Sequence, residues 1–250
     1  MKVCAGQYIY LWMLSASWWS WAQSHPFTIV SWSKGEQDVL DLIVQPRRGL
    51  TADLLRLAES SPESSLSSPA FISGPHGVRK SVGKYETVLL VASGPGIIAV
   101  IPHVKQLIHG YNTKSSRTRR VHFVWQLRNL DIAVAMQQWL NDLLAEDVLG
   151  DGYILTMSIY LEAGRMAEYR LLFGNHERAV VYSGPANFRR IIQEEVSGQY
   201  ILRLPGVEDE RGDMLVIASV SNDLRDELMS IAHGYLHEKV RMLRLEFQPE

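Results

Sequence analysis

The sequence predicts an α/β protein made of a small antiparallel β-barrel followed by a doubly wound, mostly parallel sheet. Up to about residue 82, short β-rich runs are separated by turn residues, as is typical of antiparallel strands. After Lys84, continuous apolar runs alternate with amphipathic segments, which indicates strands buried on both faces and covered by helices. We therefore expect two domains, at residues 1–82 and 83–250.

The first domain is expected to hold a few strands and one helix. Thr51 is the candidate N-cap of the helix, because it directly precedes apolar residues at helical spacing. A stretch rich in Ser and Pro has nothing to pack and is expected to be an exposed loop. The expected elements are strands at Gln7–Trp12, Phe27–Ser31 and Val39–Pro46, a helix at Leu50–Ala58 and the loop at Glu59–Ser68.

The second domain is expected to alternate strands with helices. The strands are expected at Thr87–Ala92, Val121–Leu127, Tyr153–Leu161, Arg178–Tyr182, Met214–Ser219 and Val240–Phe247. The helices are expected at Ile97–His109, Asp131–Glu146, Asn187–Val196 and Asp223–Gly234.

Two interpretations of the first two dozen residues are open. Lys2 followed by the apolar stretch Tyr8–Trp19 imitates a secretory signal. Four tryptophans interspersed with Gln, Tyr and Ser make a poor signal core, and the alternation at Gln7–Trp12 favours a strand. No segment reaches the roughly 18–20 uninterrupted apolar residues of a membrane-spanning helix. The chain is therefore not expected to cross a bilayer by itself.

The composition excludes several classes of function. The 250 residues are 46% hydrophobic and 21% charged, which is ordinary for a globular protein, and the formal net charge of −2 gives no reason to expect nucleic acid as a partner. The single cysteine, Cys4, excludes an internal disulfide and a cysteine-rich metal site. His233 and His237 are four residues apart but lack the adjacent glutamate of a zinc protease helix, so no metal site is expected.

A glycine-bearing loop follows the first strand of the second domain. Ser93-Gly94-Pro95-Gly96 turns the chain into a helix, whose free N–H groups and positive dipole end suit a pyrophosphate. Gly94, Gly96 and Ala99 fit the G-x-G-x-x-A variant of the dinucleotide fingerprint. The alternative is a tight turn that serves packing alone.

Two later strands end in residues that suit the same ligand. Gly184-Pro185 forms a second turn between strand and helix, and Ser183 can donate to a phosphate or ribose oxygen. An ordinary turn with Ser183 as helix cap is the alternative. Arg128 stands where a cation can meet a 2′-phosphate, although a solvated surface arginine is the default.

The first domain carries residue types that suit a flavin nucleotide. Pro26 makes a regular strand unexpected around it, so His25 and Thr28 can both reach one ligand, with Phe27 as an aromatic wall. Thr51, at a helix start after Gly49-Leu50, adds candidate phosphate contacts. Each also has a plain structural interpretation, with Phe27 in the core and His25 in a satisfied turn.

Taken in order, these motifs resemble the reductase half of the ferric reductase and NADPH oxidase family. The most specific match is Gln23-Ser24-His25-Pro26-Phe27-Thr28-Ile29, which is similar to the family's FAD motif. The other similar segments are Ala5–Trp12 before that motif, Arg47–Thr51 at the FAD pyrophosphate, the interdomain bend Gly74–Gly77, the NADPH loop within Val91–Pro102, and the ending Leu245–Pro249, which resembles the fungal C-terminus.

The resemblance implies a ferredoxin-reductase-like fold with FAD and NADPH as cofactors. It implies an FAD site of His25, Pro26, Phe27, Thr28, Gly49, Leu50, Thr51 and Phe247, with Phe247 covering the flavin. It implies an NADPH site of Ser93, Gly94, Pro95, Gly96, Arg128, Ser183, Gly184 and Pro185.

The sequence departs from the family pattern at several places. Complete members carry heme-binding transmembrane helices and further barrel strands before this region, so the resemblance implies a truncated barrel here. Ser93 replaces the first residue of a Gly-Gly pair, and His76 replaces an aromatic residue. Ser219 stands at the place of a cysteine near the nicotinamide, which puts the efficiency of transfer in doubt.

The first functional hypothesis is an NADPH-dependent flavin oxidoreductase that passes electrons to a ferric chelate or a heme, including a membrane heme partner. The alternatives are an NADPH-oxidase-like module and a truncated nucleotide-binding paralogue without independent turnover. Family members are membrane proteins with this half in the cytosol, so a cytosolic or peripheral location is expected.

Overall fold

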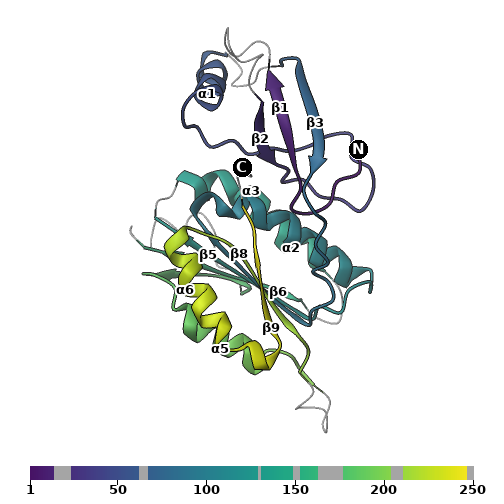
Figure 1. Cartoon of the computed structure of the whole chain (residues 1–250), viewed down its shortest axis with the longest axis vertical. Coiled ribbons are helices and arrows are strands. Elements are labelled where there is room, and N and C mark those ends of the chain that lie inside the picture. The colour runs from purple at the N-terminus through teal and green to yellow at the C-terminus, as the bar shows by residue number, and fades with distance from the viewer. Residues whose placement is uncertain are drawn as a thin grey trace.

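The protein contains two sheets, and both expected kinds are confirmed. The computed structural model describes residues 1–13, 24–61, 67–128, 131–148, 153–162, 177–203 and 211–246. These residues form a three-stranded antiparallel sheet, in the order β2-β1-β3, and a six-stranded parallel sheet, in the order β7-β6-β5-β4-β8-β9. The small sheet and helix α1 lie at one end of the molecule, and the large sheet with its helices forms the rest (Figure 1).

The small sheet is built around the first strand of the chain. Its elements are β1 (Tyr8–Met13), β2 (His25–Thr28), α1 (Leu50–Ser60) and β3 (Ala70–His76). In β1, Ile9 and Leu11 are buried while the alternate Tyr8 and Tyr10 are partly exposed, as the two-residue period of a strand dictates. The strand expected at the N-terminus is therefore confirmed.

Three local predictions in this half are wrong. The segment around Pro26 is a regular strand, because β2 lies at the sheet edge, where proline's missing N–H costs no ladder hydrogen bond. Val39–Pro46 is not a strand, and only an isolated bridge joins Leu42 to Ile29. The N-cap of α1 is Gly49 rather than Thr51.

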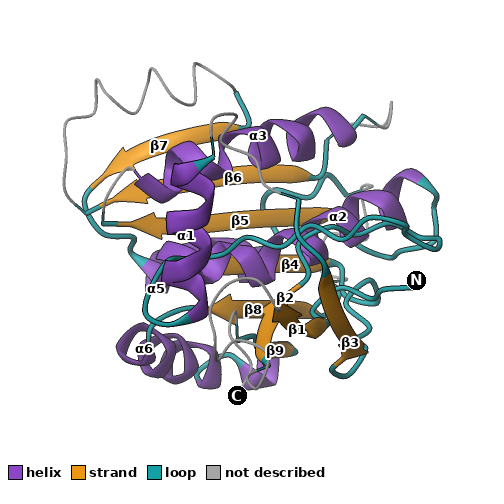
Figure 2. Ribbon diagram, turned by 90° about the horizontal axis from the view of Figure 1, so that it is seen from above, coloured by secondary structure: helices purple, strands orange, loops and turns teal. Residues whose placement is uncertain are grey.

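The large sheet follows the expected alternation closely. Its strands are β4 (Thr87–Ser93), β5 (Arg120–Leu127), β6 (Leu155–Leu161), β7 (Ala179–Ser183), β8 (Met214–Ser219) and β9 (Val240–Arg244). Its helical elements are η2 (Gly94–Gly96), α2 (Ile97–Asn112), α3 (Asp131–Glu146), α5 (Phe188–Ser197), α6 (Asn222–His233) and η3 (Leu236–Glu238). Figure 2 shows the strands side by side across the molecule.

Helices cover both faces of this sheet. Alternate residues of β4 point to opposite faces: Val88 and Leu90 pack in a core with α2 and α3, and Leu89 and Val91 in a second core with α5 and α6. All four side chains are fully buried, which explains why a continuous apolar run predicts this strand correctly.

The small sheet is attached to the large domain through α2. Val30 belongs to the large core, and the ring of Trp32 meets that of His109 edge-on, with centroids 5.6 Å apart. Gly6 lies directly over His103, so close that a Cβ there would be 2.9 Å from Nε2 of the histidine. Within the described residues, no helix is long and apolar enough to span a membrane.

Candidate functional site

The predicted nucleotide residues gather at the carboxyl ends of the parallel strands. From β4 the chain proceeds outward to β5, β6 and β7 on one side, whereas β8 and β9 lie on the other. Ligands of open α/β sheets bind at such a reversal, outside the carboxyl ends of the strands. The loop from Ser93 to Gly96 leaves β4 at this point, and Ser219 ends β8 beside it. The amide of Ser221 donates to Ser93 Oγ over 2.9 Å and ties the two strand ends together.

The two glycines of the loop do different things. Gly94 has a φ of +48°, a left-handed conformation that favours glycine, and no atom lies within 4 Å of where its Cβ would be. Its carbonyl accepts a hydrogen bond of 2.9 Å from Trp125 Nε1. Gly96 is buried, and a Cβ there would lie 1.9 Å from the carbonyl oxygen of Ser219. Residue 96 must therefore be glycine because its backbone packs closely against the end of β8. The sequence had suggested close contact with a ligand as the reason.

Arg128 lies beside an acidic residue that the sequence analysis missed. Arg128 is 86% exposed, and its Nε donates to Glu162 Oε2 over 3.0 Å. Gln126 Nε2 donates to the other oxygen of Glu162 over 2.6 Å. Glu162 directly follows β6, as Arg128 directly follows β5. Because parallel strands end at the same edge of a sheet, their positions in the sequence could have predicted that these two residues are close.

The Ser183-Gly184-Pro185 turn lies at the same edge. Gly184 has a φ of +88°, and its amide donates to the carbonyl of Leu161 over 2.7 Å. Asn187, whose side chain accepts from the amide of Arg190, is the N-cap of α5, so the alternative with Ser183 as cap is wrong. Ser183 itself is exposed at the end of β7.

The predicted flavin residues of β2 are mostly buried. Phe27 is 6% exposed and packs with Leu11 and Leu50, which is the core interpretation rather than that of an exposed aromatic wall. Thr28 is also buried. The Nε2 atom of His25 is buried and has no hydrogen-bond partner among the described residues, so it is available to a ligand atom.

The start of α1 has open space beside Gly49, and hydrogen bonds hold its backbone in place. Gly49 has a φ of +64°, and nothing lies within 4 Å of where its Cβ would be. Thr51 Oγ1 accepts from the amide of Arg47 and donates to the carbonyl of Arg48, which fixes the turn into the helix. Phe247, the predicted flavin cover, lies outside the described residues.

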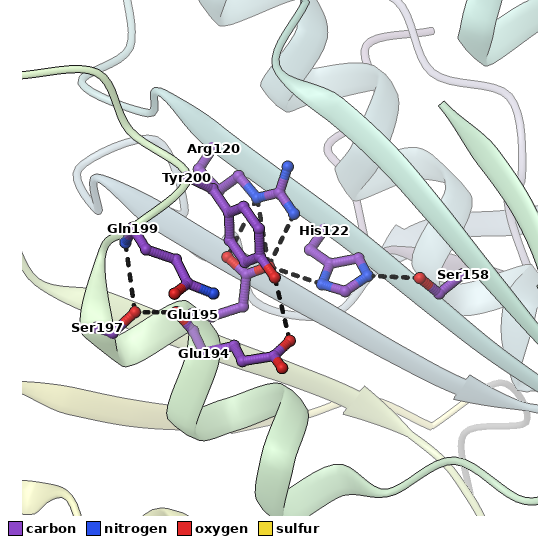
Figure 3. Close-up of polar contacts among 8 residues, drawn as sticks. All are labelled: Arg120, His122, Ser158, Glu194, Glu195, Ser197, Gln199 and Tyr200. Carbon is purple, nitrogen blue, oxygen red and sulfur yellow. Dashed lines mark hydrogen bonds and ion pairs between the residues drawn. The ribbon is translucent and has the colours of Figure 1, made fainter. Parts of the chain in front are cut away.

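A buried polar network connects the sheet to α5 (Figure 3). Glu195 of α5 is 3% exposed and receives a two-pronged ion pair from Arg120, with the shortest contact at 2.8 Å. His122 Nδ1 lies 2.7 Å from Glu195 Oε1, and its Nε2 lies 2.8 Å from Ser158 Oγ. A carboxylate only accepts hydrogen bonds, so Nδ1 of His122 carries the proton.

The network keeps Glu195 ionised. Burial raises the pKa of this carboxyl, but the hydrogen bonds from His122 and Arg120 outweigh burial, so the net pKa lies below the ordinary value. No sequence pattern predicts this network, because its members lie on β5, β6 and α5 and meet only in the folded chain.

A separate cavity of about 330 Å³ lies at the opposite edge of the sheet. Its lining includes Thr87 and Met214, the first residues of β4 and β8, and the charged residues Glu86 and Arg203. It is therefore not at the carboxyl edge where the nucleotide residues gather. Among the described residues, no group of three His, Cys, Asp or Glu side chains is placed to hold a metal ion.

The two parts of the chain match two known types of domain. Residues 1–95 match the model of an FAD-binding domain, and residues 85–169 match that of the ferric reductase NAD binding domain. The chain is therefore similar to the reductase half of ferric reductases. Its two domains are those of an oxidoreductase module that joins FAD to a nicotinamide nucleotide.

Curated ferric reductases of fungi and plants are similar to the chain. A probable cell surface ferric reductase of Aspergillus oryzae is 31% identical over 140 residues, and ferric reductase transmembrane component 5 of Saccharomyces cerevisiae is 33% identical over 134; each match covers 52% of this chain. Ferric reduction oxidase 5 of Arabidopsis thaliana is 28% identical over 128 residues, or 50% of this chain. In all three cases the match spans only 18% of the relative's length.

Solved structures confirm the fold of the chain. The FAD/NAD binding domain of a Vibrio cholerae nitric oxide dioxygenase has a TM-score of 0.57 at 13% identity, covering 98% of this chain and 86% of that one. The CS-b5R domains of human Ncb5or, in the NAD⁺ form, have a TM-score of 0.56 at 16% identity, covering 97% and 61%. The ferredoxin-reductase-like fold implied by the motifs is confirmed.

Proposed function

We propose that the chain is an NADPH-dependent flavin oxidoreductase of ferric-chelate reductase type, with an FAD domain at residues 1–82 and an NADPH domain at 83–250. The observation that carries this is the convergence at one sheet edge of the Ser93–Gly96 loop, Arg128, the Ser183–Pro185 turn and Ser219. Its electron acceptor is a ferric chelate or a heme, the latter on a membrane partner. The assignment of a ferric acceptor is supported by the similar proteins, which are named as ferric reductases.

The residues present fit both nucleotides. At the NADPH site, the loop and the N-terminus of α2 would hold the pyrophosphate, Arg128 would meet the 2′-phosphate, and Ser219 would lie near the nicotinamide. The open space at Gly94 leaves the loop accessible. At the FAD site, the unpartnered His25 Nε2 and the open start of α1 at Gly49 would receive phosphate or ribityl oxygens, and Phe247 would cover the ring.

The protein's part in the reaction is to bind and orient. When bound, FAD supplies the exchange between hydride transfer and single-electron steps. The hydrogen bonds from Ser221 to Ser93 and from Trp125 to Gly94 hold the nucleotide loop against the ends of β8 and β5. Such a fixed loop lowers the ordering cost of binding, because its conformation exists before the ligand arrives.

The test is a visible spectrum of the purified chain with added FAD, before and after anaerobic NADPH. We expect stoichiometric flavin bands that bleach on NADPH addition, followed by recovery when ferric citrate is added. Flavin that binds but stays oxidised would favour a nucleotide-binding paralogue without turnover. A folded chain without flavin bands would contradict the FAD assignment.

A further inference from the structure

A cluster of polar side chains at the ends of β5 and β6 combines a positive and a negative charge, and this combination affects which coenzyme can bind. It consists of Gln126, Arg128 and Glu162. The carboxylate of Glu162 accepts from Gln126 Nε2 at 2.6 Å and from Arg128 Nε at 3.0 Å. The amide of Glu162 donates to the carbonyl of Leu127 over 2.9 Å, which fixes the backbone of Glu162 against the end of β5.

The position of this cluster is set by the sheet. β5 lies directly beside β4, and β6 lies beside β5. A dinucleotide with its pyrophosphate on the β4 loop places its adenosine ribose beyond the end of the neighbouring strand. The cluster therefore lies where the ribose 2′-position would be.

Arginine and glutamate make opposite choices at that position. A guanidinium attracts the 2′-phosphate of NADPH, whereas a carboxylate accepts from the free 2′-hydroxyl of NADH and repels a phosphate. Glu162 is 30% exposed and Arg128 86% exposed, so both can meet a ligand as well as each other. Gln126 also accepts from the amide of Ala186, so it cannot turn to the ligand without leaving the Gly184-Pro185 turn.

We propose that Glu162 is a coenzyme-specificity residue: it holds Arg128 and opposes the 2′-phosphate, so that the site accepts NADH alongside NADPH. This inference rests on the proposed function, because it assigns a role at the same nucleotide site. Glu162 acts through charge, and its effect on binding therefore weakens as ionic strength rises.

The test is titration of the purified chain with NADP⁺ and with NAD⁺ at low salt. In Glu162→Gln, whose amide oxygen can still accept one of the two hydrogen bonds, we expect NADP⁺ affinity to rise about tenfold while NAD⁺ affinity stays equal or falls. One charge removed at a partly solvated site is worth roughly that factor. Glu162→Asp, which keeps the charge, should keep the wild-type ratio within about threefold.

Two controls complete the design. Glu146→Gln removes an exposed carboxylate at the last residue of α3, outside the nucleotide edge, and should change neither affinity. Thermal unfolding confirms that each variant is folded. Binding of both nucleotides with an unchanged ratio in Glu162→Gln would overturn the role of Glu162 alone. A folded wild-type chain that binds neither nucleotide would overturn the proposed nucleotide site and this inference with it.

Discussion

Gly96 illustrates how a residue that matches a ligand motif can serve the fold. Its absent side chain leaves room for the carbonyl of Ser219, and an added Cβ would lie 1.9 Å from that oxygen. Gly96 is buried at the junction of η2 and α2, and the oxygen is backbone at the end of the buried strand β8, so neither can move aside cheaply. A large substitution at this position would therefore disturb folding as well as any ligand.

At residue 96 we predict that Gly96→Ala destabilises the protein by about 1–3 kcal/mol, the usual cost of overpacking. The measurement is the midpoint of urea unfolding at constant slope. The matched control is Gly35→Ala, where nothing lies within 4 Å of the new Cβ and the change should stay within about 0.5 kcal/mol. Equal midpoints for the two variants would mean that the loop adjusts freely.

At the scale of elements, the attachment of α5 to the sheet depends on one carboxylate. Glu195 is ion-paired to Arg120 and hydrogen-bonded to His122, both from β5. Its neighbour Glu194 pairs with Arg190 on the same helix, where the arginine side chain is 75% exposed. Glu194 also accepts a hydrogen bond from Tyr200 Oη over 3.1 Å, in an exposed contact. The two adjacent glutamates thus differ in burial and in whether their charged partner lies on another element.

We predict that Glu195→Gln destabilises the protein by on the order of 3 kcal/mol, because it leaves the Arg120 charge without its buried partner. Glu194→Gln should cost at most about 0.5 kcal/mol, as for exposed helical pairs. Urea unfolding of the two variants measures the difference. The stabilisation by Glu195 is present above the pKa of the unfolded carboxyl and is lost as the pH falls through its depressed folded value. An equal loss of unfolding free energy in both variants would contradict the role of Glu195 in attaching α5 to the sheet.

For the molecule as a whole, the contact between the N-terminal segment and α2 covers an unpaired histidine. His103 on α2 is fully buried under Gly6, and neither ring nitrogen has a hydrogen-bond partner among the described residues. Burial lowers the pKa of His103 to about 4. The unfolded chain therefore takes up this proton at a higher pH than the folded chain, and acid favours unfolding.

We predict that His103 removes on the order of 3 kcal/mol of stability as the pH falls from about 6.5 to 4. In His103→Leu this loss should be absent, so its stability relative to wild type rises towards pH 4. Unfolding by urea at several pH values measures the difference, and His237→Gln, at an exposed position, should follow wild type. Parallel pH profiles for wild type and His103→Leu would show that the ring titrates normally.

How far the sequence predicts this structure depends on burial. The bounds of β8 and α3 match the sequence prediction, because their apolar patterns face a continuous core. β3 was not expected, since Ala70–His76 is largely exposed and contains Gly74-Pro75, which suggests a bend. Val39–Pro46 has strand-like composition but finds only one bridge in the small sheet.

The candidate site divides in the same way. Gly94 and Gly184 are visible in sequence because left-handed turns after strands favour glycine, and Arg128 is visible because it directly follows a strand. Glu162 and Glu195 are not, because an acidic residue on a separate element gains meaning only from the partners that folding brings to it. The sequence also could not tell which neighbour requires Gly96 to lack a side chain.

The hydrogen bond from Trp125 to the Gly94 carbonyl gives the Ser93–Gly96 loop an optical reporter. This indole is fully buried, so its fluorescence should lie to the blue of the emission from the partly exposed Trp12, Trp32 and Trp139. Any displacement of Gly94 changes the polarity felt by the indole N–H. In a chain whose Trp18, Trp19 and Trp21, which lie outside the described residues, are replaced by Phe, emission selected at the blue edge would therefore follow the loop in real time, without any label or turnover.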